Sequence, residues 1–196
     1  MNGGAVCTMA ADGIHSMPRI HVLGASGSGS TTLGEALAHL LDVPHADADR
    51  FFWLPTDPPF TTRRPRAERL AMLTQRLPAG GDWVFSGSAI SWATVLEPAY
   101  DLIVLLRLDP ALRMPRLRQR EQARYGARID PGGDMAAASA AFLRWAEAYD
   151  TAGPAQRSLA AHEAWLVGQT VPVLRLDSAE PVDALVAAVR RRLSSL

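Results

Sequence analysis

A glycine-rich turn between an apolar run and an amphipathic segment restricts the fold of this chain more than any other feature. Residues 20–23 read Ile-His-Val-Leu, the pattern of a short buried strand. Residues 24–32 then read Gly-Ala-Ser-Gly-Ser-Gly-Ser-Thr-Thr. Four leucines follow at spacings that place them on one face of a helix: Leu33, Leu37, Leu40 and Leu41. The sequence therefore predicts a strand, a tight turn and a helix start within about 20 residues.

The turn resembles the phosphate-binding P-loop G-x-x-x-x-G-K-[ST], with glycines at Gly24 and Gly29 and its hydroxyl residue at Thr31. Glycines let the backbone curve around an anion, so that amide groups and the helix N-terminus point inward. The resemblance implies that the loop binds ATP or another nucleoside triphosphate and that Thr31 binds the accompanying Mg²⁺. The candidate nucleotide-binding residues are Gly24, Ser26, Gly27, Ser28, Gly29, Ser30, Thr31 and Thr32. The alternative is a plain strand-to-helix turn with a serine or threonine cap.

Ser30 stands where the motif has its lysine. All 20 basic residues of the chain are arginine, and a general drift from lysine to arginine would not place serine here. The departure is therefore specific to this position. A P-loop lysine supplies positive charge to the β- and γ-phosphates, whereas a serine hydroxyl donates only a hydrogen bond.

Three hypotheses follow from this substitution. In the first, an arginine from the predicted lid or from the 62–69 helix replaces the lysine, and the protein is an active phosphotransferase. In the second, the protein is a catalytically weak or inactive nucleotide-binding or regulatory protein of the same fold. In the third, the loop binds another phosphorylated ligand or anion and no ATP. The first is favoured because an acidic pair and an arginine cluster accompany the loop.

Composition bounds the remaining possibilities. The chain has 196 residues, 48% of them hydrophobic, and a formal net charge of zero, so neither nucleic acid nor a membrane is an expected partner. No apolar run approaches the roughly 20 residues that span a bilayer. Residues 1–18 lack the pattern of a signal peptide and are predicted to be a flexible leader containing the single cysteine, Cys7. We expect one domain over residues 19–196, a cytoplasmic location, and a monomer or homodimer.

Strands and helices alternate along the rest of the chain. Further strands are predicted at residues 43–49, 83–85, 101–106 and 171–176, and a loop at 125–134. Helices are predicted at residues 62–77, 90–97, 110–124, 135–150, 155–167 and from 181 onward. This order predicts an α/β fold with a parallel sheet covered by helices on both faces.

Polar residues lie at the carboxyl ends of four of the predicted strands. Besides the glycine-rich turn, they are Asp47 and Asp49, the run Ser86-Gly87-Ser88, and Arg175 with Asp177. Because ligands of such sheets bind beyond the carboxyl ends of the strands, we expect these groups to meet at one edge.

This arrangement is similar to the nucleoside-monophosphate kinase superfamily, nearest to its shikimate- and gluconate-kinase-like branch and to adenylate-kinase-like proteins. The similarity covers roughly residues 19–195. It implies a three-layer fold with a five-stranded parallel sheet in the order 2-3-1-4-5, an acceptor-binding insertion at about 50–80 and a mobile arginine-rich lid at about 120–135. It also implies that Asp47 helps to hold hydrated Mg²⁺ and that Asp49 binds or activates the acceptor hydroxyl. The alternative for both aspartates is the capping of a turn.

Arginines supply the remaining candidates. Arg113, Arg116, Arg120 and Arg124 are spaced to face one way on a helix, where like charges repel and a phosphoryl group would relieve the repulsion. Of these, Arg116, Arg120 and Arg124 are the predicted phosphate contacts; the alternative is a solvated helix face. The residues assigned to a small-molecule acceptor are Asp49, Arg63, Arg64, Ser86, Gly87 and Ser88, and Arg175 is assigned to the nucleotide. Nearby aromatic residues, Phe51 to Trp53 and Phe60, line an acceptor pocket or form a local core.

Overall fold

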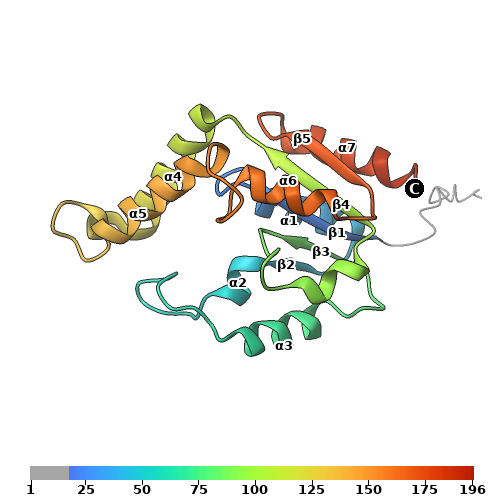
Figure 1. Cartoon of the computed structure of the whole chain (residues 1–196), viewed down its shortest axis with the longest axis horizontal. Helices are drawn as coiled ribbons and strands as arrows, with labels where there is room; N and C mark the ends of the chain where they lie inside the picture. The colour runs from blue at the N-terminus through green and yellow to red at the C-terminus, as the bar shows by residue number, and fades with distance from the viewer. Residues whose placement is uncertain (1–17) are drawn as a thin grey trace, which may run out of the picture.

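The computed structural model describes residues 18–196, so Cys7 and all but the last residue of the predicted leader lie outside the described part. A five-stranded, wholly parallel sheet forms the centre of the molecule (Figure 1). The strand order is β2-β3-β1-β4-β5, which confirms the predicted 2-3-1-4-5 topology. The strands are β1 (Arg19–Gly24), β2 (His45–Asp47), β3 (Trp83–Ser86), β4 (Leu102–Arg107) and β5 (Val173–Asp177).

Seven α-helices and three short 3₁₀ helices connect the strands within the described residues. The α-helices are α1 (Ser30–Leu41), α2 (Ala48–Phe52), α3 (Arg66–Arg76), α4 (Pro110–Tyr125), α5 (Ala136–Glu147), α6 (Leu159–Val167) and α7 (Val182–Leu193). The 3₁₀ helices are η1 (Thr94–Ala99), η2 (Gly126–Ile129) and η3 (Ala148–Asp150). None of the helices in this part of the chain is both long and apolar enough to cross a membrane.

Several boundaries differ from the predicted ones for local reasons. The helix predicted from residue 62 begins at Arg66, because Arg63 pairs with Trp53 in an isolated antiparallel bridge and Pro65 precedes the first turn. The helix predicted from residue 155 begins after Ser158, whose side chain accepts a hydrogen bond from the amide of Ala161 at 3.0 Å. The helix predicted over 90–97 is instead the shifted 3₁₀ helix η1, with Pro98 inside it.

Two hydrophobic cores hold the three layers together. On one face of the sheet, α1 and α7 bury Leu37 and Val189 against the strands. On the other face, α3, η1 and α6 contribute Leu73, Leu96 and Leu166. Because β1 and β4 are covered on both faces, their sequences are almost continuously apolar. The carboxyl ends of the strands remain open to the site described below.

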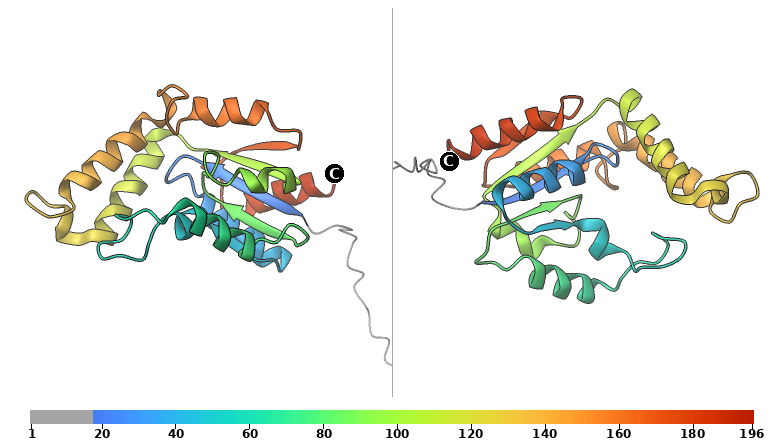
Figure 2. Two further views of the ribbon diagram at one scale, coloured as in Figure 1. Left: turned by 60° about the horizontal axis from the view of Figure 1, so that its bottom comes forward. Right: turned by 180° about the vertical axis from the view of Figure 1, so that it is seen from behind.

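Helices α4 and α5 pack against each other and project from the sheet as a helical hairpin (Figures 1 and 2). A small separate core lies between them, built around Met114, Leu117 and Ala146. The hairpin occupies the part of the chain where a lid was predicted, and it includes η2 within the predicted loop.

Candidate phosphate-binding site

The loop between β1 and α1 has the curvature that its glycines predict. Gly27 and Gly29 have φ angles of +82° and +88°, in the left-handed region that glycine tolerates best. A Cβ atom on Gly27 would lie 2.8 Å from Cγ of Leu117, so this glycine also lets α4 approach the loop. Helix α1 begins at Ser30, immediately after the turn, and its first amide groups have no partners within the helix. The local geometry is therefore that of an anion-binding loop.

Ser28 adds a polar side chain to this loop. Its hydroxyl is completely buried and has no hydrogen-bond partner among the described residues. It lies beside Gly24 and β4, because a Cβ atom on Gly24 would come within 2.5 Å of this oxygen and 2.6 Å of the carbonyl oxygen of Leu106. The hydroxyl therefore packs inside the loop, and the backbone amides are what the loop offers to a phosphorylated ligand.

Thr31 and Asp47 meet at the mouth of the loop. The Thr31 hydroxyl donates to Oδ2 of Asp47 at 2.5 Å, and the amide of Asp49 donates to Oδ1 at 2.8 Å. Asp47 therefore caps α2, as one of the sequence interpretations holds, while its other oxygen faces Thr31. A hydroxyl and a single carboxylate suit Mg²⁺, which keeps several waters and takes further oxygens from phosphates. Residues 18–196 contain no cluster of three or more histidine, cysteine or acidic residues placed to hold a metal ion by themselves.

Asp49 lies beside this pair. Although part of its side chain reaches solvent, protein surrounds its carboxyl group closely, and this desolvation is the main cause of a raised pKa of Asp49. The negative charge of Asp47 raises that pKa further, whereas the positive charges of Arg157, Arg120 and Arg124 act in the opposite direction. A carboxylate with a raised pKa near phosphate-binding groups has the properties of a general base.

Arg157 was not among the residues predicted from sequence. Its Nη2 atom donates to the carbonyl oxygen of Gly24, the first residue of the loop, at 2.8 Å. It comes from the connection between η3 and α6, where no periodicity or motif marks it. The missing lysine was the one available signal, since it requires a cation from elsewhere, but that signal does not say which arginine.

The predicted lid arginines have different surroundings. Arg120 is close enough to Asp47 and Asp49 for their charges to raise its pKa, although burial lowers that pKa more strongly. Arg124 stacks on Phe60, with 4.0 Å between its guanidinium carbon and the ring centroid. Arg116 is exposed on α4.

Arg113 does not lie on the open face of α4 that was predicted for the four arginines. Its side chain is completely buried, where it binds Asp150 at 2.6 Å and the carbonyl of Ala146 at 2.8 Å. The helical spacing is as predicted, but α5 and η3 cover α4 near its beginning. The expectation that all four arginines face an open site is therefore wrong for Arg113.

The other predicted basic residues bind protein groups. Arg64 donates to the carbonyl oxygens of Phe51 and Trp53 at 3.1 and 3.2 Å, and so fixes the chain that follows α2. Arg175 forms an ion pair with Glu163 at 2.6 Å. Arg63 is exposed, with its guanidinium carbon 5.8 Å from the centroid of the Phe52 ring.

The run after β3 is engaged in buried hydrogen bonds. Ser86 is fully buried and binds Nε2 of His45 at 2.9 Å. Gly87 has a φ angle of +95°, and its carbonyl oxygen lies 3.0 Å from Nε2 of His21. Ser88 lies 2.9 Å from Nε2 of His162, whose Nδ1 is 2.7 Å from the hydroxyl of Tyr149. The hydroxyl of Ser86 is therefore enclosed by protein and bound to His45.

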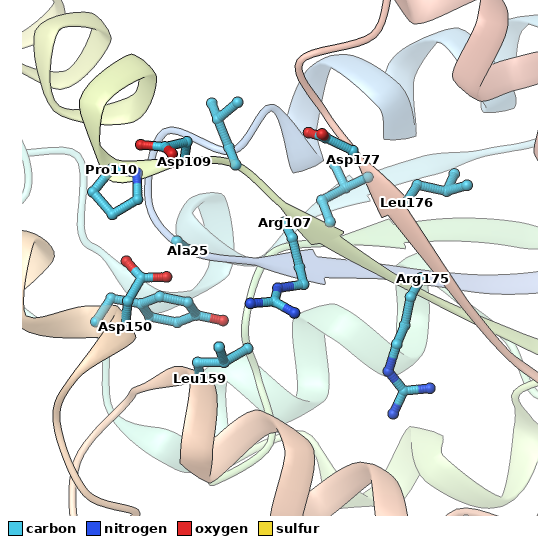
Figure 3. A pocket seen from close by; sticks show the side chains of 12 residues that line it. Ala25, Arg107, Asp109, Pro110, Asp150, Leu159, Arg175, Leu176 and Asp177 are labelled. Atoms are coloured by element: carbon cyan, nitrogen blue, oxygen red, sulfur yellow. The ribbon is translucent and has the colours of Figure 1, made fainter.

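A cavity of about 550 Å³ borders the phosphate loop at Ala25 (Figure 3). It lies beyond the ends of β4 and β5, and its lining includes Tyr149 and Asp177. Figure 3 shows Arg107 in the middle of this space, between Asp150 and Arg175. The cavity is large enough for a nucleoside, and its polar groups offer hydrogen-bond partners for one.

On the opposite side of the loop, the tip of the segment 53–62 touches the helical hairpin. Arg128 binds Asp57 at 2.6 Å, and the Tyr125 hydroxyl donates to the carbonyl of Pro59 at 3.0 Å. Together with the stacking of Arg124 on Phe60, these contacts form a bridge that we call the clasp. The clasp connects the predicted acceptor-binding insertion to the predicted lid.

Comparison with known proteins agrees with this geometry. YqaC, an uncharacterized protein of Bacillus subtilis strain 168, is 40% identical to this chain over 176 residues, which are 90% of this chain and 97% of YqaC. The structure of a gluconokinase from Sinorhizobium meliloti 1021 superposes with a TM-score of 0.54 at 18% identity, over 91% of this chain and 93% of the other. A shikimate kinase from Bacteroides thetaiotaomicron gives a TM-score of 0.54 at 19% identity, over 91% of this chain and 99% of the other. No protein-family model matches the chain.

Proposed function

Since this chain belongs to the same family as YqaC and has the fold of gluconokinase and shikimate kinase, we propose that it is a P-loop phosphotransferase. In this proposal it binds ATP or another nucleoside triphosphate together with Mg²⁺, and it transfers the γ-phosphoryl group to a small metabolite or nucleotide. The observation that carries the proposal is the 2.5 Å contact between Thr31 and Asp47 at the mouth of a glycine-rich loop.

The nucleotide would lie across the loop. Backbone amides of the loop would bind its phosphates, and the cavity beside Ala25 would accept its nucleoside. Thr31 and Asp47 would hold Mg²⁺, which neutralises negative charge that develops on the phosphates.

Asp49 would act as the general base. It takes the proton of the acceptor hydroxyl while the acceptor oxygen forms a bond to the γ-phosphorus. The bond between that phosphorus and the bridging oxygen breaks at the same time, and the nucleoside diphosphate leaves. Arg120 and Arg124 would stabilise the transferring group or an anionic acceptor, because their charges act on Asp49 whereas no such effect of Arg116 is found.

A second candidate function is nucleotide binding with little or no transfer. The observation that favours it is Ser30, which leaves the loop itself without a cation. Backbone amides bind phosphate without lysine, but transition-state charge requires a compensating group.

Two measurements separate the candidates. Calorimetric titration with ATP and Mg²⁺ tests binding, and release of ADP in the presence of hydroxylated metabolites and nucleoside monophosphates tests transfer. We expect binding, and turnover with one acceptor class that falls by about 100-fold or more in Asp49→Asn. Asp183→Asn, an exposed change on α7, is the matched control. Binding without turnover for any acceptor would favour the second function, and the absence of binding would contradict both.

A further inference from the structure

The phosphate loop lacks a positive charge of its own. Residues 24–32 contain only small and hydroxyl side chains, with Ser30 at the position of the motif's lysine. Backbone amides carry partial charges, which orient a triphosphate but do not neutralise it. If the proposed function holds, a cation must reach the loop from another part of the chain.

Arg157 already touches the loop. Its Nη2 atom donates to the carbonyl oxygen of Gly24 at 2.8 Å, and its guanidinium carbon lies 5.5 Å from the centroid of the Trp145 ring. Its position is fixed by the next residue, the buried Ser158, which donates to the carbonyl of Gly153 at 2.9 Å and caps α6. The arginine is therefore held at the loop by its own backbone as well as by its contact with Gly24.

The charge of Arg157 is not matched by an acid at close range. The guanidinium groups of Arg113, Arg175 and Arg128 each bind a carboxylate at 2.6 Å, whereas Arg157 has no ion pair within the described residues. Its Nε atom is buried without a hydrogen-bond partner in the same part of the chain. Enclosing a cation in this way is costly unless an anion accompanies it. Burial accordingly lowers the pKa of Arg157, and the charge of Asp49 partly offsets this.

We propose that Arg157 replaces the missing lysine by binding the phosphate groups of the nucleotide held in the loop. This inference rests on the proposed function and names the residue on which phosphate binding depends. The guanidinium can bind two phosphate oxygens at once, which a lysine ammonium in the loop cannot do with the same geometry. The nucleoside does not carry this charge, so Arg157 contributes to the binding of ATP and of inorganic triphosphate and not to that of adenosine.

The test is a double-mutant cycle between Arg157→Met and Ser30→Lys, with dissociation constants measured by calorimetry in the presence of Mg²⁺. We expect Arg157→Met to weaken the binding of ATP and of triphosphate by about 10- to 100-fold and to change adenosine binding less than twofold. Adding Ser30→Lys to Arg157→Met should restore most of the loss, because it returns a cation to the loop. Arg118→Met, an exposed change on α4, is the control and should bind all three ligands as the unsubstituted protein does.

The binding measurements distinguish a failure of the proposed function from a failure of the inference about Arg157. If the unsubstituted protein binds neither ATP nor triphosphate, the proposed function fails and the inference fails with it. If it binds both and Arg157→Met binds them equally well, only the inference fails. An equal loss for adenosine would also contradict it, since that loss would report damage to the fold.

A further measurement keeps the inference testable if Arg157→Met does not fold. In the otherwise unsubstituted protein, Ser30→Lys should improve ATP affinity less than threefold, because Arg157 already supplies the charge. A gain of tenfold or more would mean that the loop was uncompensated and would overturn the inference.

Discussion

Thr31 donates a hydrogen bond to Asp47 at 2.5 Å, and this contact joins the first turn of α1 to the end of β2. Because the sheet is parallel, the carboxyl ends of β1 and β2 lie at the same edge, although β3 separates the two strands. The phosphate loop and the acidic end of β2 are thereby one unit. A change at either residue should disturb the other.

Replacing Thr31 with valine removes the hydroxyl and keeps the shape of the side chain. We expect Mg²⁺-dependent ATP affinity to fall by about tenfold, the cost of one charge-assisted contact, while affinity measured with excess chelator stays unchanged. Calorimetric titration with and without Mg²⁺ measures both. Thr74→Val on α3, where the hydroxyl binds only its own helix, is the control. An equal loss in the chelated sample would show that Thr31 supports the loop and not the metal ion.

Asp49 should determine how kcat/KM falls on the acid side of its pH profile. Burial and the charge of Asp47 raise the pKa of Asp49, so the protonated, inactive form persists to higher pH than for an ordinary aspartate. The value of kcat/KM should fall as the pH drops through this raised pKa. In Asp47→Asn the midpoint should move to lower pH, because one negative neighbour is removed. A midpoint that stays in place would assign the acid limb to another group.

Two glycines of the loop offer a matched pair for stability. Both have positive φ angles, but a Cβ on Gly27 meets Leu117 at 2.8 Å, whereas a Cβ on Gly29 meets nothing within 4 Å. Gly29→Ala should cost about 1 kcal/mol of unfolding free energy from backbone strain alone. Gly27→Ala should cost about 3 kcal/mol, since overpacking against α4 is added. Denaturant unfolding of the two variants measures the difference, and equal costs would contradict the close approach of α4.

Two buried histidines should make the fold sensitive to acid. Burial lowers the pKa of His21 to about 4 and, together with the charge of Arg157, that of His162 to about 3. The unfolded chain binds a proton at each histidine below about pH 6.5, so stability decreases as the pH falls from there toward 4. Each histidine should lower the free energy of unfolding by about 2 kcal/mol at pH 5.

His162→Gln tests this assignment. Between pH 7 and pH 5 the unsubstituted protein should lose unfolding free energy. The His162→Gln variant should lose about 2 kcal/mol less over the same range. His39→Gln, an exposed change on α1, is the control. If both variants show the original slope, the acid sensitivity has another source.

The fold could be predicted because its signals are local. Apolar runs the length of strands alternate with helical periodicity, and the glycine-rich turn marks the first strand end. The resemblance to known kinases then supplied the strand order, which the structure confirms. Boundaries were less predictable where a single contact decides them, as at Ser158.

Only some of the candidate site residues could be predicted from the sequence, and the reason is physical. Asp47 and Asp49 follow a strand and could be placed by topology alone. Helical spacing put Arg113 with Arg120 and Arg124, but spacing does not reveal which part of a helix another helix covers. Arg157 lies in a connection without periodicity, and its contact with Gly24 joins residues 133 positions apart in the chain.

The clasp couples the position of the segment 53–62 to that of the helical hairpin. Asp57, Pro59 and Phe60 are tied to Arg128, Tyr125 and Arg124, so the segment that would meet the acceptor and the hairpin that would cover the phosphates cannot shift independently. A ligand that drew Arg124 inward would therefore pull the segment 53–62 with it. If the proposed function holds, binding at one substrate position would change the shape of the other, and the order of substrate binding would depend on these three contacts.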